Sequence, residues 1–198
     1  MLTDDVAKEF LKDRIIYISG EVNVEMSDYV IRLLLYLDKK APGKEIKIYI
    51  NSSPGGQVRP GIGMIDTIRT IKSPVSVVAI GYVASMASVL LSCGDKGKRF
   101  IQKGAQVMIH QVSSGIERSK NEDIQVMARN TDNLNKYLIT LLAENCDKTY
   151  EEVLNDCRTD YWMTAEEAVK YGIVDEIIQE ADKSSNSIIT EDDLNWEV

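Results

Sequence analysis

Hydrophobic residues along the chain follow two alternating patterns. Four short runs rich in β-branched and aromatic residues predict strands at residues 14–20, 45–51, 75–81 and 106–111. Between the first strands, residues 27–39 and 61–72 place apolar side chains at helical spacing, which predicts two helices, the first with Ser27 as its N-cap. Strands and helices in this alternation predict an α/β protein with βαβ units and a mainly parallel sheet.

A single long helix is predicted over residues 119–146, which contain neither Gly nor Pro. Its narrow apolar stripe consists of Ile124, Met127, Leu134, Leu138, Leu141 and Leu142. A stripe of this kind on one helix needs a second surface to cover it. Two further helices open with capping boxes, which pair Thr149 with Glu152 and Thr164 with Glu167, and a glycine ends the second helix.

Size and charge narrow the classes of function. The 198 residues suffice for one domain, followed at residues 181–198 by an acidic tail that we expect to be flexible. The net charge of −8 argues against nucleic acid as a partner, because phosphate binding needs a basic surface. No apolar run approaches the roughly 20 residues of a membrane span. Three cysteines without a CxxC pattern, and no signal peptide, lead us to expect reduced thiols in a cytoplasmic protein.

Two side chains stand out as candidates for chemistry. His110 is the only histidine, at the end of a predicted strand, so any histidine-dependent mechanism must use it. Ser85 lies between the strand at 75–81 and the helix-forming residues 86–92, near the positive end of a helix dipole. Such a serine is either a nucleophile or an N-cap, and the local pattern does not decide between them.

A glycine loop follows the second strand. Gly55 and Gly56 permit close backbone approaches, so this loop is either a source of an N–H donor for an oxyanion or only a tight turn. Neither a phosphate-binding loop nor an HExxH motif is present, and a single histidine excludes a multi-histidine metal site. We therefore expect neither a metal nor a cofactor in this chain.

Taken together, five stretches resemble the ClpP family, the proteolytic subunits of the Clp protease. They are RIIYISGEV (14–22), INSSPGG (50–56), GYVASMASVLLSCGDKGKRF (81–100), MIHQ (108–111) and TAEEAVKYGIVDEII (164–178). Their order is far more specific than any one of them, and the resemblance spreads over most of residues 5–180. It implies an α/β, ClpP/crotonase-like fold of repeated β-β-α units with a protruding handle helix.

The resemblance also implies a role for each site residue. Ser85 would be the nucleophile and His110 the general base, with the backbone N–H groups of Gly56 and Met86 forming the oxyanion hole. The third member of the triad would be Asp160 in the segment DCRTDYWMTAEEA. Asp156, a helical turn earlier, is a weaker candidate for that place.

Assembly and partners follow from the same resemblance. One peptidase domain would span residues 1–180, with a head at about 1–118 and 147–180 and a handle helix at about 119–146. Heptameric rings would stack through their handles into a tetradecamer, and a ring-shaped AAA+ Clp ATPase would feed unfolded polypeptides into it. ATP would be used by that partner, which leaves this subunit without a cofactor.

Some positions depart from the family pattern and keep other functions open. Only Met1 to Asp4 precede the matching part, Lys47 stands where the docking surface for the ATPase is usually apolar, and Thr159 replaces an arginine before Asp160. Val112 likewise replaces a proline. A catalytically weak or conditionally active ring partner of another ClpP paralogue is therefore the alternative. The shared fold also allows a crotonase-type acyl-CoA enzyme, although that chemistry does not need this serine and histidine.

Overall fold

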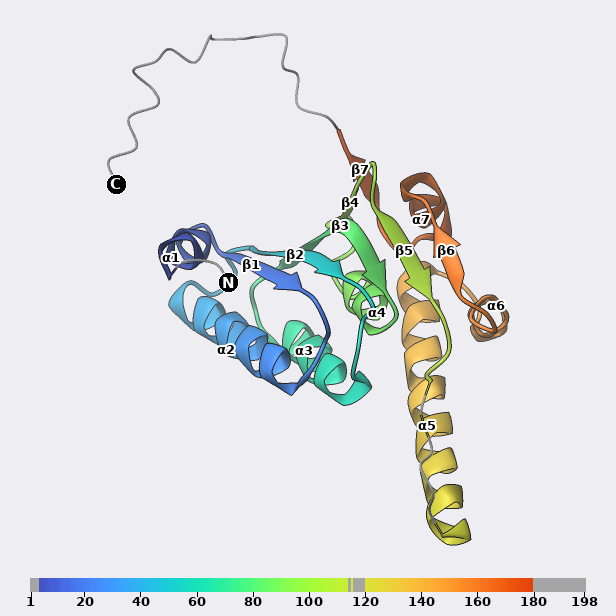
Figure 1. Cartoon of the computed structure of the whole chain (residues 1–198). Helices are drawn as coiled ribbons and strands as arrows, with labels where there is room; N and C mark the ends of the chain where they lie inside the picture. The colour runs from blue at the N-terminus through green and yellow to red at the C-terminus, as the bar shows by residue number, and fades with distance from the viewer. Residues whose placement is uncertain (1–3, 114, 116–119, 180–198) are drawn as a thin grey trace, which may run out of the picture.

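Seven strands form one twisted sheet in the part of the chain that the computed structural model describes, residues 4–113, 115 and 120–179 (Figure 1). The first five run parallel in the order β1 (Ile15–Ser19), β2 (Ile46–Ser52), β3 (Val75–Ala84), β4 (Arg99–Gln102) and β7 (Glu176–Ile178). The other two are β5 (Gln106–Ile109), parallel to β3, and β6 (Tyr161–Met163), antiparallel to β5. The α/β fold with a mainly parallel sheet is thus confirmed.

Strand β3 is the branch point of this sheet. Its first half, at Val77 to Ala79, pairs with β4, whereas its second half, at Tyr82 to Ala84, pairs with β5. The sheet therefore divides along β3. Because β3 and β5 run parallel and in register near their ends, the residues that follow the two strands emerge side by side.

Helices cover the sheet and form a chain of contacts. Their bounds are α1 (Asp4–Lys12), α2 (Val24–Lys40), α3 (Val58–Thr70), α4 (Met86–Ser92), α5 (Asn121–Cys146), α6 (Tyr150–Asp156) and α7 (Ala165–Tyr171). Helix α2 packs on α3, α3 on α4, and α4 on α5. All seven residues of α4 are buried, so this short helix is the centre of the packing. Of the described helices, none is long and apolar enough to cross a membrane.

Helix α5 projects well beyond the sheet, as the handle implied by the family resemblance would (Figure 1). It begins at Asn121, whereas the residues just before Lys120 lie outside the described part of the chain. The C-terminal half of its apolar stripe is buried against the body, at Leu138, Leu141 and Leu142. Toward the free end, Met127 is 39% exposed. The predicted tail, 181–198, also lies outside the described residues.

Several boundaries differ from those that the sequence predicts. Ser27 is not an N-cap: α2 begins three residues earlier, Asn23 caps it through Met26 N–H, and the Ser27 hydroxyl donates to the carbonyl of Pro60. Helix α3 likewise starts before residue 61, and β3 continues past Gly81. Both capping boxes are confirmed, and the second helix ends at a left-handed glycine. The sequence pattern predicts neither α1 nor the short strands β4, β6 and β7.

Candidate active site

Ser85 occupies the turn between β3 and α4. Its backbone has φ 57° and ψ −124°, a conformation that residues with a side chain rarely adopt, and its N–H donates to the carbonyl of Met108 at 2.9 Å. The side chain makes no capping hydrogen bond to α4. Of the two interpretations that the sequence leaves open, the structure contradicts the N-cap and leaves the hydroxyl available for another contact.

That contact is with the only histidine of the chain. The Ser85 hydroxyl lies 2.8 Å from His110 Nε2, and the other ring nitrogen, Nδ1, lies 3.1 Å from Asp160 Oδ1. The His110 side chain is 25% exposed and that of Asp160 is 59% exposed. Strand pairing explains the contact between His110 and Asp160. Ile109, which precedes His110, lies opposite Tyr161, which follows Asp160. Three residues that are distant in sequence thus form one continuous chain of polar contacts.

Asp156, the weaker candidate for the acidic residue, lies elsewhere. It accepts a hydrogen bond from the hydroxyl of Tyr171 at 3.1 Å. Burial, together with the nearby charge of Asp156, raises the pKa of the Tyr171 phenol well above its ordinary value. This pair therefore holds α6 against α7, and Asp160 alone of the two aspartates contacts the histidine.

The glycine loop passes directly over the Ser85 turn. A Cβ atom at Gly55 would lie 2.4 Å from the carbonyl oxygen of Ala84 and 2.9 Å from Met86 N, so only glycine permits this approach. Two hydrogen bonds hold the loop against Val22. Val22 N–H donates to the Gly55 carbonyl, and Gln57 N–H donates to the Val22 carbonyl. The loop is thus fixed against the turn that carries the serine.

Two backbone N–H groups remain without an acceptor beside the serine. Within the described residues, neither Gly56 N–H nor Met86 N–H makes a hydrogen bond. Both residues line the small pocket next to Ser85 and His110. The arrangement therefore offers two free N–H donors beside the Ser85 side chain.

The pocket itself is small, and both polar and apolar side chains line it. It is lined by Gly56, Val58, Ser85, Met86, Val89, His110, Gln111, Val112, Ser113, Asn135, Leu138, Ile139 and Leu142. Its volume is about 40 Å³, against roughly 300 Å³ or more for a preformed ligand pocket. Asn135 is a polar residue in this wall that its sequence position alone does not mark as functional. It lies three, four and seven residues before Leu138, Ile139 and Leu142, a spacing that puts all four side chains on one face of α5.

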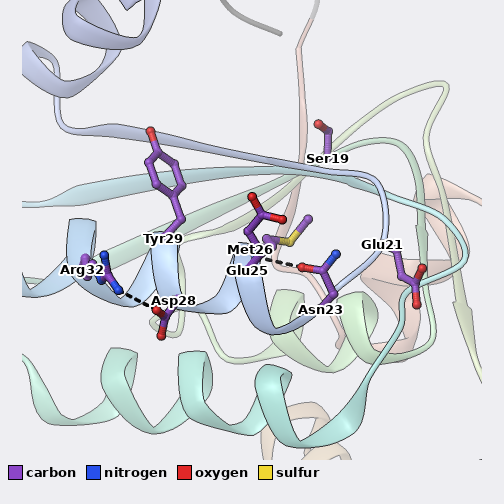
Figure 2. A pocket seen from close by; sticks show the side chains of 8 residues that line it. All are labelled: Ser19, Glu21, Asn23, Glu25, Met26, Asp28, Tyr29 and Arg32. Carbon is purple, nitrogen blue, oxygen red and sulfur yellow. Dashed lines mark hydrogen bonds and ion pairs between the residues drawn. The ribbon is translucent and has the colours of Figure 1, made fainter.

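A larger hollow of about 830 Å³ lies elsewhere, at the start of α2 (Figure 2). Three of its polar side chains are already engaged: Asn23 caps the helix, and Asp28 pairs with Arg32 at 2.6 Å. It contains none of the residues predicted to be catalytic. We therefore place the candidate site at the smaller pocket, where a nucleophile, a base and free donors meet.

Neither a reactive cysteine nor a metal-binding cluster is found in the described part of the chain. Its three cysteines are buried, free thiols. Burial raises the pKa of Cys93, and it raises that of Cys146 and Cys157 to about 12, which keeps all three protonated at neutral pH. No group of three or more His, Cys, Asp or Glu residues is placed to hold a metal ion there.

Comparison with known proteins identifies the family. The sequence profile of the Clp protease family matches residues 1–181. The ATP-dependent Clp protease proteolytic subunit of Deinococcus radiodurans is 41% identical over 176 residues, which cover 89% of this chain and 85% of that protein. The protein of the same description from Bacteroides fragilis is 42% identical over 174 residues, 88% of this chain and 83% of that protein. The chain therefore belongs to the Clp protease family, whose proteolytic subunits are serine peptidases.

Proposed function

We propose that the chain is a serine endopeptidase subunit in which Ser85, His110 and Asp160 act as a catalytic triad. The observation that carries this proposal is the 2.8 Å contact between the Ser85 hydroxyl and His110 Nε2, made by a serine that does not cap its helix. Asp160 accepts from the opposite ring nitrogen, which favours the tautomer with a free lone pair on Nε2. Serine alone is a poor nucleophile, and this base removes its proton.

The reaction follows the established logic of acyl transfer. As the Ser85 oxygen forms a bond to the peptide carbonyl carbon, its proton passes to His110 Nε2, and the carbonyl oxygen takes the negative charge. The N–H groups of Gly56 and Met86 donate to that oxygen, and one such donor is worth roughly 3 kcal/mol of transition-state stabilisation. His110 then gives its proton to the leaving amine, and a water activated by the same histidine hydrolyses the acyl-enzyme.

We propose further that the chain works within an assembly. Its α5 projects from the body with Met127 and Val126 exposed, at 39% and 56%, as expected for a helix that another subunit covers. The relatives are described as ATP-dependent, which supports a AAA+ Clp ATPase as the partner that supplies unfolded polypeptides. Heptameric rings stacked into a tetradecamer, and a cytoplasmic location, remain predictions of the family resemblance.

One observation favours a second candidate, a conditionally active ring partner of another ClpP paralogue. The pocket beside Ser85 measures about 40 Å³, so its walls must move before a large side chain can enter. Contacts made on assembly with a different subunit would supply that movement. Hydrolysis by the purified protein alone distinguishes this candidate from the first.

The experiment compares peptide hydrolysis by the purified assembled protein with hydrolysis by Ser85→Ala, His110→Ala and Asp160→Asn variants. The serine and histidine variants are expected to lose on the order of 10⁶-fold in turnover, and the aspartate variant about 10⁴-fold. Activity that appears only after a second paralogue is added would support the conditional partner. Activity that survives Ser85→Ala would contradict both.

A further inference from the structure

The backbone that follows His110 is held at two points rather than by a strand ladder. Strand β5 ends at Ile109, and residues 110–113 are in neither helix nor strand. Gln111 N–H donates to the carbonyl of Cys157 at 3.0 Å, and Val112 N–H donates to Asn135 Oδ1, also at 3.0 Å. The first bond reaches the segment that leads to Asp160, and the second reaches helix α5. These bonds hold the backbone after His110 against the Asp160 segment and against helix α5.

Asn135 belongs to a continuous face of α5. With Leu138, Ile139 and Leu142 it lines the pocket beside Ser85, and these three apolar residues are buried while Asn135 is half-buried. Its oxygen accepts from Val112, which is itself half-buried and packs against the core. Without that oxygen, the Val112 N–H would be left without its protein acceptor in a place with restricted access to water, a costly state for a backbone donor.

We propose that Asn135 is a positioning residue for the peptidase reaction. By holding Val112 N–H, it fixes the segment after His110 and with it the distance between His110 Nε2 and the Ser85 hydroxyl. Asn135 makes no hydrogen bond to either side chain; its effect passes through the backbone. The inference rests on the proposed function, because only a catalytic His110 needs placement of this accuracy, where a shift of about 1 Å can cost on the order of a hundredfold in rate.

Three variants separate positioning from packing. Asn135→Ala removes the acceptor, Asn135→Asp keeps an oxygen in its place, and Asn133→Ala is the matched control, an exposed asparagine on the same helix. For peptide hydrolysis we expect Asn135→Ala to lower kcat about tenfold with KM within about twofold, and Asn135→Asp to stay within about threefold of the parent. An effect confined to KM, or an equal effect from Asn133→Ala, would overturn the proposal.

A double-mutant cycle tests the stated contact itself. Val112→Pro removes the N–H that Asn135 accepts, so Asn135→Ala should have no further effect on kcat in that background. A full tenfold loss in the Val112→Pro background would contradict the proposal. Should Val112→Pro fail to fold, the comparison of Asn135→Ala with Asn135→Asp still decides, because only the alanine variant lacks the acceptor.

A readout independent of activity comes from the single histidine. Its imidazole ¹³C and ¹H signals, recorded on histidine-labelled protein, report on His110 alone. We expect them to move or broaden in Asn135→Ala and to stay unchanged in Asn133→Ala. Unchanged signals in both variants would overturn the inference. Failure of the parent protein to react with a serine-directed phosphonate would instead overturn the proposed function, and the histidine signals would still decide whether Asn135 positions the ring.

Discussion

At the scale of single residues, Ser85 shows what a structure adds to a pattern. A serine between a strand and a helix fits an N-cap and a nucleophile equally well in the sequence, because both stand at that point of the pattern. The two differ in the backbone conformation and in what the hydroxyl contacts, and neither can be read from the sequence. Here the hydroxyl lies beside His110 and not on the first turn of α4, and Asp160 rather than Asp156 contacts the ring. The choice between Asp160 and Asp156 depends on the pairing of β5 with β6, two strands that are distant in sequence.

A buried ion pair gives a prediction at the same scale. Arg99 is 2% exposed and pairs with Asp175, which also accepts from the Arg99 backbone N–H. Burial alone would raise the pKa of the Asp175 carboxyl, but the hydrogen bonds and charge of Arg99 outweigh it and hold that pKa below its ordinary value. The charged form therefore stabilises the fold above about pH 4, and this stability is lost as the pH falls through the folded-state pKa.

Asp175→Asn should thus lower the free energy of unfolding at pH 7 by about 3 kcal/mol, because it leaves the Arg99 charge buried without its partner. Urea unfolding measures this, and the difference from the parent should shrink below pH 4. The control is Asp147→Asn, whose exposed pair with Lys96 should contribute less than about 1 kcal/mol. Equal losses in both variants, or a difference that does not change with pH, would contradict the assignment.

At the scale of elements, the glycine loop and the Ser85 turn act as one unit. Gly55→Ala places a Cβ against the backbone on both sides of Ser85, at a φ of +90° that also disfavours a side chain. We expect this variant to lose at least about a hundredfold in the rate of Ser85 acylation. Gly97→Ala is the control, since it has a similar φ of +79° but open space around it. It should lose only about 1 kcal/mol of stability and keep its rate. Similar rates in both variants would contradict the close packing.

The helices and strands also show which parts of the fold could be predicted from the sequence alone. The long strands, α5 and both capping boxes could be predicted because each carries a periodic pattern or a cap in its own residues. Ser27 could not be rejected as an N-cap, because Asn23 offers the same chemistry and only the packing of α2 on α3 buries Ser27. Strand β6, with three residues, is too short to show a period. Yet β6 is the strand that brings Asp160 to His110.

At the scale of the whole molecule, the free end of α5 leaves apolar side chains exposed, among them Val126 and Met127. Its stripe continues from the buried Leu138 to the exposed Met127, so one surface is covered in part by this chain and in part remains open. We attribute the open part to a second copy. The assembly would then depend on residues that contribute nothing to the fold of one subunit.

This attribution is tested by Met127→Glu, with Gln125→Glu on another face of the same helix as the control. The first should dissociate the assembled particle into smaller species, because it places a charge where about 1 kcal/mol of further apolar burial per subunit is expected. The second should leave the mass unchanged. Sedimentation velocity measures both. A parent particle that is monomeric, or an equal effect from Gln125→Glu, would contradict a handle that joins subunits.

The central claim is that Ser85 is a nucleophile activated by the only histidine of the chain. The most direct measurement is the mass of the intact protein, and of its peptides, after reaction with a fluorophosphonate. We predict one adduct per chain, located on Ser85, which is lost in Ser85→Ala and strongly slowed in His110→Ala. An adduct on another residue, one that persists in Ser85→Ala, or no adduct on the assembled protein would contradict the claim.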